Sequence, residues 1–403
     1  MAQVRTDKEL VELFLTRGTE MVYPTTEELR KKLMSGERLT VYQGFDPTGK
    51  FLHVGHAMGI RAMRILQQLG HRVIFLVGDF TSRVGDPDKE SGRKMLTTEE
   101  IASNMAGWKE QAAQMIDFEG ENPVEFMGNF DWLSKLTLSE VIELMSHMTV
   151  QQMLERDMFE RRMKAGDPIR LQEFIYPLMQ GYDSVAMNVD IEMCGADQTF
   201  NALTGRQLMR NYLGKEKFVR TNKMMDAPDG RTMSKTKGNG INLGDTSEDM
   251  YGKAMSYGDD KITMGLELLT YVPMEEIARI DHAIKNGENP MPFKKMMAFE
   301  IVKEIRGEAE AQRAQAFFEK TVQNKEIPED IEERHLGKKE VLLLDFLVES
   351  GMVTSKGEGR RLMEQDGIKV DGKAVRDLGA MLIPSEDGTL VQKGKRHILR
   401  VFA

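Results

Sequence analysis

The sequence predicts an α/β protein in which a parallel-sheet domain is followed by an α-helical domain and a small α+β domain. Strand and helix patterns alternate in the first third, only helical patterns follow residue 246, and the pattern changes again near residue 338. A chain of 403 residues is also too long for one ordinary core. We therefore expect domains at residues 1–245, 246–330 and 338–403.

A strand–helix–strand unit opens the predicted sheet. The runs "LTVYQGF" (Leu39–Phe45) and "RVIFLVGD" (Arg72–Asp79) are typical of buried strands. Between them, apolar residues recur at helical spacing from Met58 to Leu69, and Gly70 ends that helix. Because two strands joined by a helix normally run parallel, this pattern indicates a βαβ unit.

Further strands are expected at Val124–Met127 and Val189–Cys194, with helices between them. Parallel sheets bind ligands at the carboxyl ends of their strands, where the segments "GFDPT", "GDFTSRVGDP" and "CGADQ" are predicted to lie. From residue 246 to about residue 323 the chain carries only helical patterns, which predicts the second domain.

The C-terminal segment has a different character. The run "VLLLDFLVES" (Val341–Ser350) predicts an apolar helix, Ser355–Glu358 forms a capping-box pattern, and Asp371–Gly372 predicts a hairpin turn. From Lys338 onward, 12 basic residues face 10 acidic ones, so this segment carries +2 of a total charge of −9. A slightly basic tail on an acidic body suggests that a small module contacts RNA.

Composition limits the class of protein. Apolar residues make up 40% of the chain and charged residues 30%, which is ordinary for a globular protein. No apolar run approaches the length of a membrane span, and the N-terminus lacks the apolar core of a signal peptide. Cys194 is the single cysteine, which excludes an internal disulfide. We expect a cytoplasmic protein with a buried, structural Cys194 and no membrane partner.

The segment "YQGFDPTGKFLHVGHAMGI" (Tyr42–Ile60) places two histidines where a helix is expected to begin. Backbone N–H groups at a helix N-terminus bind anions, and Gly55 allows a nucleotide to approach closely. Thr48, His53 and His56 offer hydrogen-bond donors to phosphate or ribose. The alternative is a zinc site, although no third ligand stands at a familiar spacing.

A second segment, "PDGRTMSKTKGN" (Pro228–Asn239), carries Lys235 and Lys237 in a glycine-flanked loop. Such a loop suits a lid that closes over polyphosphate, and the alternative is an exposed basic turn. The "HVGH" and "MSK" segments together resemble the class I aminoacyl-tRNA synthetases, which hold ATP with both. Where this family usually has lysine the chain has Thr232, so the grip on pyrophosphate is expected to be altered, with Arg231 or Lys237 compensating.

A third segment, "FIYPLMQGYDSVAMNVDIEMCGADQTFN" (Phe174–Asn201), extends the resemblance to the tyrosyl-tRNA synthetase family. The stretch from Val341 is similar to an S4-type RNA-binding domain, so the resemblance covers nearly the whole chain. It implies a Rossmann-like catalytic domain, a homodimer, and L-tyrosine, ATP with Mg²⁺, and tRNA(Tyr) as substrates, with no structural metal.

The resemblance assigns the tyrosine pocket residue by residue. It implies that Tyr42 and Asp183 hold the phenolic hydroxyl, while the ammonium and carboxylate groups are held by Tyr176, Gln180, Asp86 and Gln198. Tyr176, Gln180 and Asp183 stand at i, i+4 and i+7, which places them on one helical face. The alternative for this face is contact with water. Thr81 either lines the pocket or packs in the core.

The resemblance also assigns the nucleotide site. The implied ATP contacts are Gly44, Asp46, His53, Gly55, His56, Gly195, Asp197, Met233, Ser234 and Lys235. The reaction that follows is attack of the tyrosine carboxylate on the α-phosphorus of ATP, which expels pyrophosphate and needs no general base. Thr48, His53, His56 and Lys235 are the expected catalytic groups. One or more of Lys89, Arg93 and Lys94 is expected to cover the phosphates.

The expected tRNA contacts are cations of the C-terminal module, Arg360, Arg361, Lys369 and Lys373, whose alternative is an ordinary solvated surface. Three other classes of protein remain possible from the sequence. A tryptophanyl-tRNA synthetase shares both nucleotide motifs but has no use for the pair of Tyr42 and Asp183. A nucleotidylyltransferase would not need an S4-like tail. Thr232 is the only feature that favours a non-catalytic RNA-binding protein with this fold.

Overall fold

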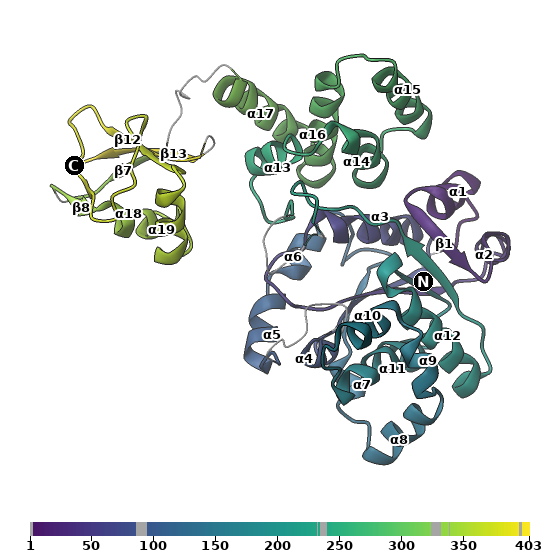
Figure 1. Ribbon diagram of the computed structural model, residues 1–403. Helices are drawn as coiled ribbons and strands as arrows, with labels where there is room; N and C mark the ends of the chain where they lie inside the picture. Colours follow the sequence, from purple (N-terminus) through teal and green to yellow (C-terminus); the bar gives the residue numbers. More distant parts are fainter. Residues whose placement is uncertain are drawn as a thin grey trace. The chain divides into compact units, whose positions relative to one another are not determined.

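The computed structural model describes residues 3–85, 95–231, 233, 240–323, 332–337, 339–394 and 397–403. It confirms the predicted class of fold, a mixed α/β protein with a parallel sheet (Figure 1). The chain divides into two compact units, one of Met1–Asp245 with Lys253–Arg306 and one of Thr246–Gly252 with Gly307–Ala403. The three predicted domain boundaries stay predictions.

A six-stranded sheet in the described residues forms the centre of the first unit, with the strand order β1-β6-β5-β2-β3-β4. Its strands are β1 (Thr19–Tyr23), β2 (Thr40–Phe45), β3 (Arg72–Val77), β4 (Glu125–Gly128), β5 (Ile191–Gly195) and β6 (Phe218–Asn222). Strands β2 to β6 run parallel, and β1 runs antiparallel to β6. The sequence patterns predicted the four strands β2 to β5 and missed the two at the other edge.

Helices cover both faces of this sheet. The connections β2–α3–β3 and β5–α12–β6 leave the centre of the sheet in opposite directions, so right-handed crossovers put α3 and α12 on opposite faces (Figure 1). The helices are α1 (Lys8–Thr16), α2 (Thr26–Leu33), α3 (Val54–Gln68), α4 (Thr81–Val84), α5 (Thr98–Met105), α6 (Trp108–Ala112), α7 (Phe130–Leu133), α8 (Leu138–Ser146), α9 (Val150–Leu154), α10 (Asp157–Ala165), α11 (Leu171–Ala186), η1 (Ala196–Gln198) and α12 (Thr199–Leu213).

In the first unit the sheet is followed by η2 (Asp259–Lys261), α14 (Ile262–Leu269), α15 (Met274–Lys285) and α16 (Met291–Arg306), whereas most of α13 (Ser247–Ala254) belongs to the second unit. Arg61 on α3 and Glu304 on α16 form a buried ion pair at 2.6 Å. The guanidinium of Arg17 donates to the backbone carbonyls of Leu266 and Glu267, which α14 leaves without helical partners at its C-terminal end. These bonds fix α14 and α16 against the domain that carries α3.

The second unit contains α17 (Glu308–Phe318), η3 (Glu319–Gln323), β7 (Glu332–His335), β8 (Val341–Leu342), α18 (Leu343–Glu349), α19 (Lys356–Glu364), β9 (Ile368–Val370), β10 (Lys373–Ala374), β11 (Met381–Leu382), β12 (Thr389–Lys393) and β13 (His397–Phe402). Its strands form a sheet with the order β10-β9-β12-β13-β7 and a separate β11–β8 pair. Asp371 and Gly372 both have positive φ, of 47° and 76°, and join β9 to β10 as the predicted turn.

Two predictions for this unit need correction. The predicted helix at 341–350 begins only at Leu343, because Val341 and Leu342 pair with β11 instead. Ser355 caps α19 as predicted, but the carboxylate of Glu358 returns to Thr354 rather than to the backbone N–H of Ser355. In the ranges described, no helix is both long and apolar enough to cross a membrane.

His71, between α3 and β3, is a buried group that titrates abnormally. Its side chain is completely buried, and its Nδ1 accepts the backbone N–H of Leu39 at 3.3 Å. Burial lowers the pKa of His71 from 6.5 to about 4. The side chain of His71 is therefore protonated below pH 6.5 in the unfolded chain, but only below about pH 4 in the folded chain.

We predict that the free energy of unfolding falls by about 3 kcal/mol between pH 6.5 and pH 4 because of this histidine. His71→Asn, which keeps an acceptor for Leu39, should remove that part of the pH dependence. Urea unfolding of both proteins at pH 7 and pH 4.5 measures the effect. The same pH dependence in both proteins would assign the loss of stability to other groups.

Candidate functional site

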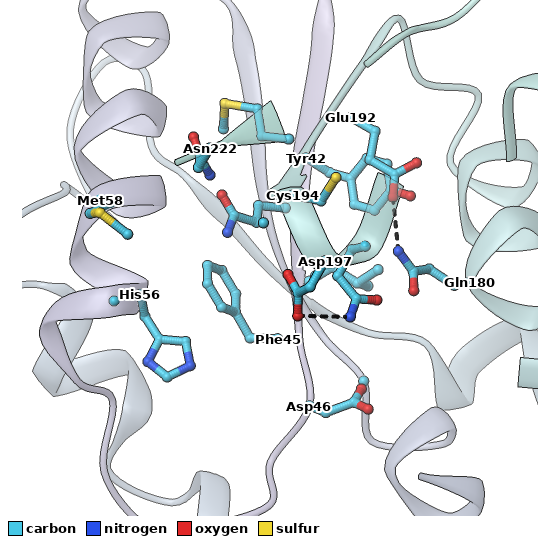
Figure 2. Close-up of a pocket in the computed structure, with 18 of the residues that line it drawn as sticks. Tyr42, Phe45, Asp46, His56, Met58, Gln180, Glu192, Cys194, Asp197 and Asn222 are labelled. Atoms are coloured by element: carbon cyan, nitrogen blue, oxygen red, sulfur yellow. Dashed lines mark hydrogen bonds between the residues drawn. The ribbon is translucent and has the colours of Figure 1, made fainter. Parts of the chain in front are cut away.

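A pocket of about 220 Å³ opens at the carboxyl ends of β2 and β5 (Figure 2). At this point the strand order reverses, which is where open α/β sheets bind ligands. Many of the predicted site residues line it: Tyr42, Gly44, Asp46, His53, Gly55, His56, Thr81, Tyr176, Gln180, Asp183, Gly195, Asp197, Gln198 and Met233. The structure therefore brings segments far apart in the sequence to one cavity.

Other predicted residues do not line this pocket. Thr48 follows β2, and its backbone N–H donates to the carbonyl of Asp46 at 2.8 Å, but its side chain is not among the pocket-lining groups. Eight other predicted residues fall outside the described residues: Asp86, Lys89, Arg93, Lys94, Thr232, Ser234, Lys235 and Lys237.

The two histidines lie at the N-terminus of α3, beside the pocket. The backbone N–H of His53 donates to Nδ1 of His56 at 3.0 Å, so the neutral His56 ring carries its proton on Nε2. A Cβ at Gly55 would lie 2.9 Å from the His53 ring, so this position requires glycine. In the part of the chain described, no cluster of three His, Cys, Asp or Glu side chains could hold a metal ion.

Backbone pairing joins the first motif to the chain that follows the "MSK" loop. The N–H of Val54 donates to the carbonyl of Ile241 at 2.9 Å, and the N–H of Leu243 donates to Leu52 at 2.7 Å. Met233 lies buried in the wall of the same pocket. The histidine segment and the described ends of the lysine segment are therefore neighbours.

Asp46, which follows β2, holds two other pocket residues. Its Oδ1 accepts the hydroxyl of Thr81 at 2.9 Å, and its Oδ2 accepts the hydroxyl of Tyr176 at 2.8 Å. A Cβ on Gly78 would collide with this carboxylate and with the Thr81 hydroxyl. Thr81 is therefore buried and also lines the pocket, where its hydroxyl is held by Asp46.

Tyr42 and Asp183 are the most buried of the predicted substrate residues, with exposed fractions of 1% and 2%. The Asp183 carboxylate accepts from Nε1 of Trp132 at 2.7 Å and from Nδ2 of Asn129 at 3.1 Å. The hydroxyls of Tyr42 and Ser184 lie 2.9 Å apart. Burial raises the pKa of both Tyr42 and Asp183 well above the usual range.

A buried ion pair that the sequence did not predict lies behind Tyr42. Glu192 stands opposite Tyr42 in the β2–β5 pair, and its carboxylate contacts the ammonium of Lys217. Lys217 also donates to Ser184 Oγ at 2.9 Å. The two charged side chains are 2% and 0% exposed. Since parallel strands buried on both faces are normally apolar, the charge of Glu192 within β5 was the signal available in the sequence.

From Glu192 a chain of hydrogen bonds crosses the pocket wall. Gln180 Nε2 donates to Glu192 Oε1 at 3.1 Å, as Figure 2 shows. Asn201 Nδ2 donates to Oε1 of both Gln180 and Gln198, and Gln198 Nε2 donates to Asp197 at 3.2 Å. Because a carboxylate only accepts, Glu192 fixes which end of the Gln180 amide points toward it.

Cys194 lies at the end of β5 and lines the same pocket. Its side chain is buried, as the sequence predicted, and burial raises the pKa of the thiol well above its usual value. A protonated thiol is a poor nucleophile, so the geometry assigns Cys194 to the wall of the pocket rather than to bond-making chemistry.

Comparison with known proteins fits this geometry. The family described as "tRNA synthetases class I (W and Y)" matches residues 34–323, and the S4 domain matches residues 341–386. A crystal structure of the Aspergillus nidulans mitochondrial tyrosyl-tRNA synthetase, truncated at its C-terminus, aligns with a TM-score of 0.62 at 24% identity. It covers 76% of this chain and 92% of that one, and it supports the fold.

Two curated relatives match nearly the full chain. The tyrosine–tRNA ligase of Thermotoga maritima is 38% identical over 98% of this chain and 98% of the relative. That of Moorella thermoacetica is 39% identical over 96% of this chain and 94% of the relative. The chain therefore belongs to the class I tRNA synthetases and, within that class, to the tyrosine–tRNA ligase family.

We predict that Lys217→Met lowers the free energy of unfolding by about 3–5 kcal/mol, because it leaves the Glu192 carboxylate buried without its cation. The matched control is Lys164→Met, which removes an exposed pair with Glu160 and should cost less than about 1 kcal/mol. Chemical denaturation of both variants measures the difference. Equal losses would mean that the Lys217–Glu192 pair has no special role in stability.

Proposed function

We propose that the protein activates L-tyrosine with ATP to form tyrosyl-adenylate and then transfers tyrosine to the 3′-terminal adenosine of tRNA(Tyr). One observation carries the proposal. A single pocket has buried Tyr42 and Asp183 at one side and the histidine-capped N-terminus of α3 at another. Membership of the tyrosine–tRNA ligase family supports the same reaction.

The polar groups of the pocket match the groups of tyrosine. Tyr42 and Asp183 receive the phenolic hydroxyl, and Tyr176 and Gln180 receive the ammonium, with Asp86 assigned to the same group by the family pattern. Gln198, which lies between Asp197 and Asn201 in the hydrogen-bond chain, stands near the carboxylate of the bound tyrosine. Tyr42, Asp183, Tyr176, Gln180 and Gln198 are each held by hydrogen bonds to neighbouring side chains before substrate enters, which lowers the cost of ordering them on binding.

In the first reaction a carboxylate oxygen of tyrosine attacks the α-phosphorus of ATP. The new bond joins that oxygen to phosphorus, the bond to the bridging oxygen breaks, and pyrophosphate leaves with its electron pair. The carboxylate is already ionised, so the residues act by positioning and by stabilising charge. His53, His56 and the N-terminus of α3 lie at the nucleotide end, together with Gly44, Gly195 and Asp197.

ATP enters as its magnesium complex, as is usual for phosphoryl substrates. Thr48, Met233, Ser234 and Lys235 complete the nucleotide site by the family pattern, and Thr232 distinguishes this lysine loop. In the second reaction a ribose hydroxyl of tRNA attacks the carbonyl carbon of the adenylate and releases AMP. We place the enzyme in the cytoplasm, where its tRNA substrate is charged.

Binding of tRNA is assigned in part to the S4 domain. Its exposed cations lie on neighbouring elements, with Arg360 and Arg361 on α19, Lys369 on β9 and Lys373 on β10. Guanidinium and ammonium groups bind phosphate, and they suit a helical RNA that is recognised by its backbone.

We predict that tyrosine supports exchange of labelled pyrophosphate into ATP at least about a hundredfold better than phenylalanine or tryptophan. A substrate without the hydroxyl cannot form the additional hydrogen bonds that the buried Tyr42 and Asp183 offer to a phenol. Exchange with tryptophan instead would indicate a tryptophanyl enzyme. Absence of exchange with every amino acid would contradict an enzymatic function and favour an RNA-binding protein.

We also propose a homodimer formed through an apolar surface on α8 and its neighbours. Leu138, Ile142 and Met145 stand on one face of α8 and are 76%, 59% and 45% exposed. A cavity of about 340 Å³, lined largely by apolar groups that include Phe130 and Val141, adjoins this helix. An exposed apolar face of this kind is typical of a contact between subunits, and a second copy presents the same face.

We predict that Leu138→Glu/Ile142→Glu converts the dimer to a monomer, because two carboxylates would be buried on each side of the interface. Met34→Glu, an exposed methionine at the end of α2, is the matched control and should remain dimeric. Light scattering coupled to size exclusion gives the mass of each protein. A monomeric wild-type protein, or a dimeric double variant, would place the subunit contact elsewhere or exclude it.

A further inference from the structure

We propose that Lys217, buried behind the pocket, directs the hydrogen bond of Tyr42 and so acts as a positioning residue for recognition of a phenolic hydroxyl. It acts through Ser184. The proposal rests on the proposed function, because it explains how the tyrosine pocket rejects an amino acid that lacks the hydroxyl. Nothing in the sequence motifs pointed to Lys217, which lies in the loop before β6.

The four side chains form one continuous buried group. Lys217 Nζ lies 2.9 Å from Ser184 Oγ and also contacts the carboxylate of Glu192. Ser184 Oγ lies 2.9 Å from the hydroxyl of Tyr42. Lys217 and Ser184 are completely buried, and Glu192 and Tyr42 are each 1% exposed. Water therefore has little access to these groups, and they must satisfy one another.

The contacts of Lys217 and the distances around Ser184 favour one direction for the Ser184–Tyr42 bond. An ammonium group has donors only, so Lys217 donates and Ser184 Oγ accepts. Ser184 then has a single proton, for which Tyr42 at 2.9 Å and Glu192 at 3.4 Å compete. The Glu192 oxygen nearest Ser184 already accepts from Lys217, and O–H···O bonds are normally shorter than about 3.0 Å, so on this proposal Ser184 donates to Tyr42. Tyr42 keeps its own proton, because burial raises its pKa, and can point it into the pocket.

Asp183 offers the substrate a hydrogen-bond acceptor, whereas Tyr42 offers a donor. Both of its carboxylate oxygens accept bonds from nitrogen donors, one from Trp132 and one from Asn129. The Asn129 amide is oriented in turn, because its Oδ1 accepts the backbone N–H of Phe80 at 2.9 Å. The pocket thus presents one donor, Tyr42, and one acceptor, Asp183. A phenolic hydroxyl, which both accepts and donates, pairs with both, and a phenyl ring pairs with neither.

Removal of Ser184 or of the charge on Lys217 should undo this arrangement. Without the Ser184 hydroxyl, the carboxylate of Glu192, which faces Tyr42 across the strand pair, competes for the Tyr42 proton. Without Lys217, no ammonium donates to Ser184 or to the neighbouring Oε2 of residue 192, so the serine hydroxyl can turn its proton toward residue 192 and accept a hydrogen bond from Tyr42 instead. In both cases Tyr42 stops donating reliably to the substrate, and tyrosine loses its advantage over phenylalanine.

The test measures amino-acid-dependent pyrophosphate exchange with tyrosine and with phenylalanine in four full-length proteins. They are the wild type, Ser184→Ala, the charge-neutral double variant Lys217→Met/Glu192→Gln, and the control Lys215→Met. The double variant avoids a lone buried charge, so it should fold even where Lys217→Met alone does not. Lys215 is a nearby lysine whose pair with Asp190 leaves it partly exposed and away from the pocket lining.

We expect the ratio of kcat/KM for tyrosine to kcat/KM for phenylalanine to fall at least about tenfold in Ser184→Ala and in the double variant. The KM for ATP and the ratio in Lys215→Met should stay at wild-type values. If both site variants are folded and keep the wild-type ratio, or lose activity equally with both amino acids, Lys217 has only a packing role. A wild type without tyrosine-dependent exchange would overturn the proposed function itself, which separates the two failures.

Discussion

The pairing of β2 with β5 is the constraint on which the whole site depends. These strands meet where the strand order reverses, and the register sets Tyr42 directly beside Glu192. A residue on either strand therefore cannot move without breaking backbone hydrogen bonds in the centre of the sheet. The base of the pocket is therefore held in place by the backbone hydrogen bonds of the sheet.

Charge buried at this base needs a partner, and the partner determines the arrangement of the polar groups around it. Glu192 is tolerated because Lys217 neutralises it and Gln180 donates to it. The orientation of the Gln180 amide in turn determines that of Asn201, whose Nδ2 donates to both Gln180 and Gln198. The result is a wall whose donors and acceptors are fixed before any ligand arrives, which is the condition for discrimination by hydrogen bonding.

Much of the fold could be predicted from the sequence because the central strands are largely apolar. β3 is the clearest example, with five of its six residues buried. Strands β1 and β6 were missed for the opposite reason. β6 buries Arg220 and Asn222, whose side chains bond to each other, and Arg220 also donates to backbone carbonyls, so the pattern of β6 resembles a polar loop. No periodicity rule detects a strand whose burial depends on such bonds.

The predictability of the site follows the same division. Residues in recognisable motifs, such as His53 and Asp197, were found and line the pocket. Groups that act behind them were not found, because Lys217 stands in the charged run "GKEKF" and looks like an ordinary surface lysine. Trp132 and Asn129 were missed as well, since their role depends on distant Asp183. Spacing along a chain cannot report such contacts.

Gly78 shows how the hydrogen bonds of the pocket restrict which residues a neighbouring position can accept. Any side chain there would displace the Asp46 carboxylate and, with it, the hydroxyls of Thr81 and Tyr176. A larger residue at position 78 therefore requires Asp46 to be absent or repositioned, so the effect of either substitution depends on the other. The glycine and the aspartate are structurally coupled, although 32 positions separate them in the chain.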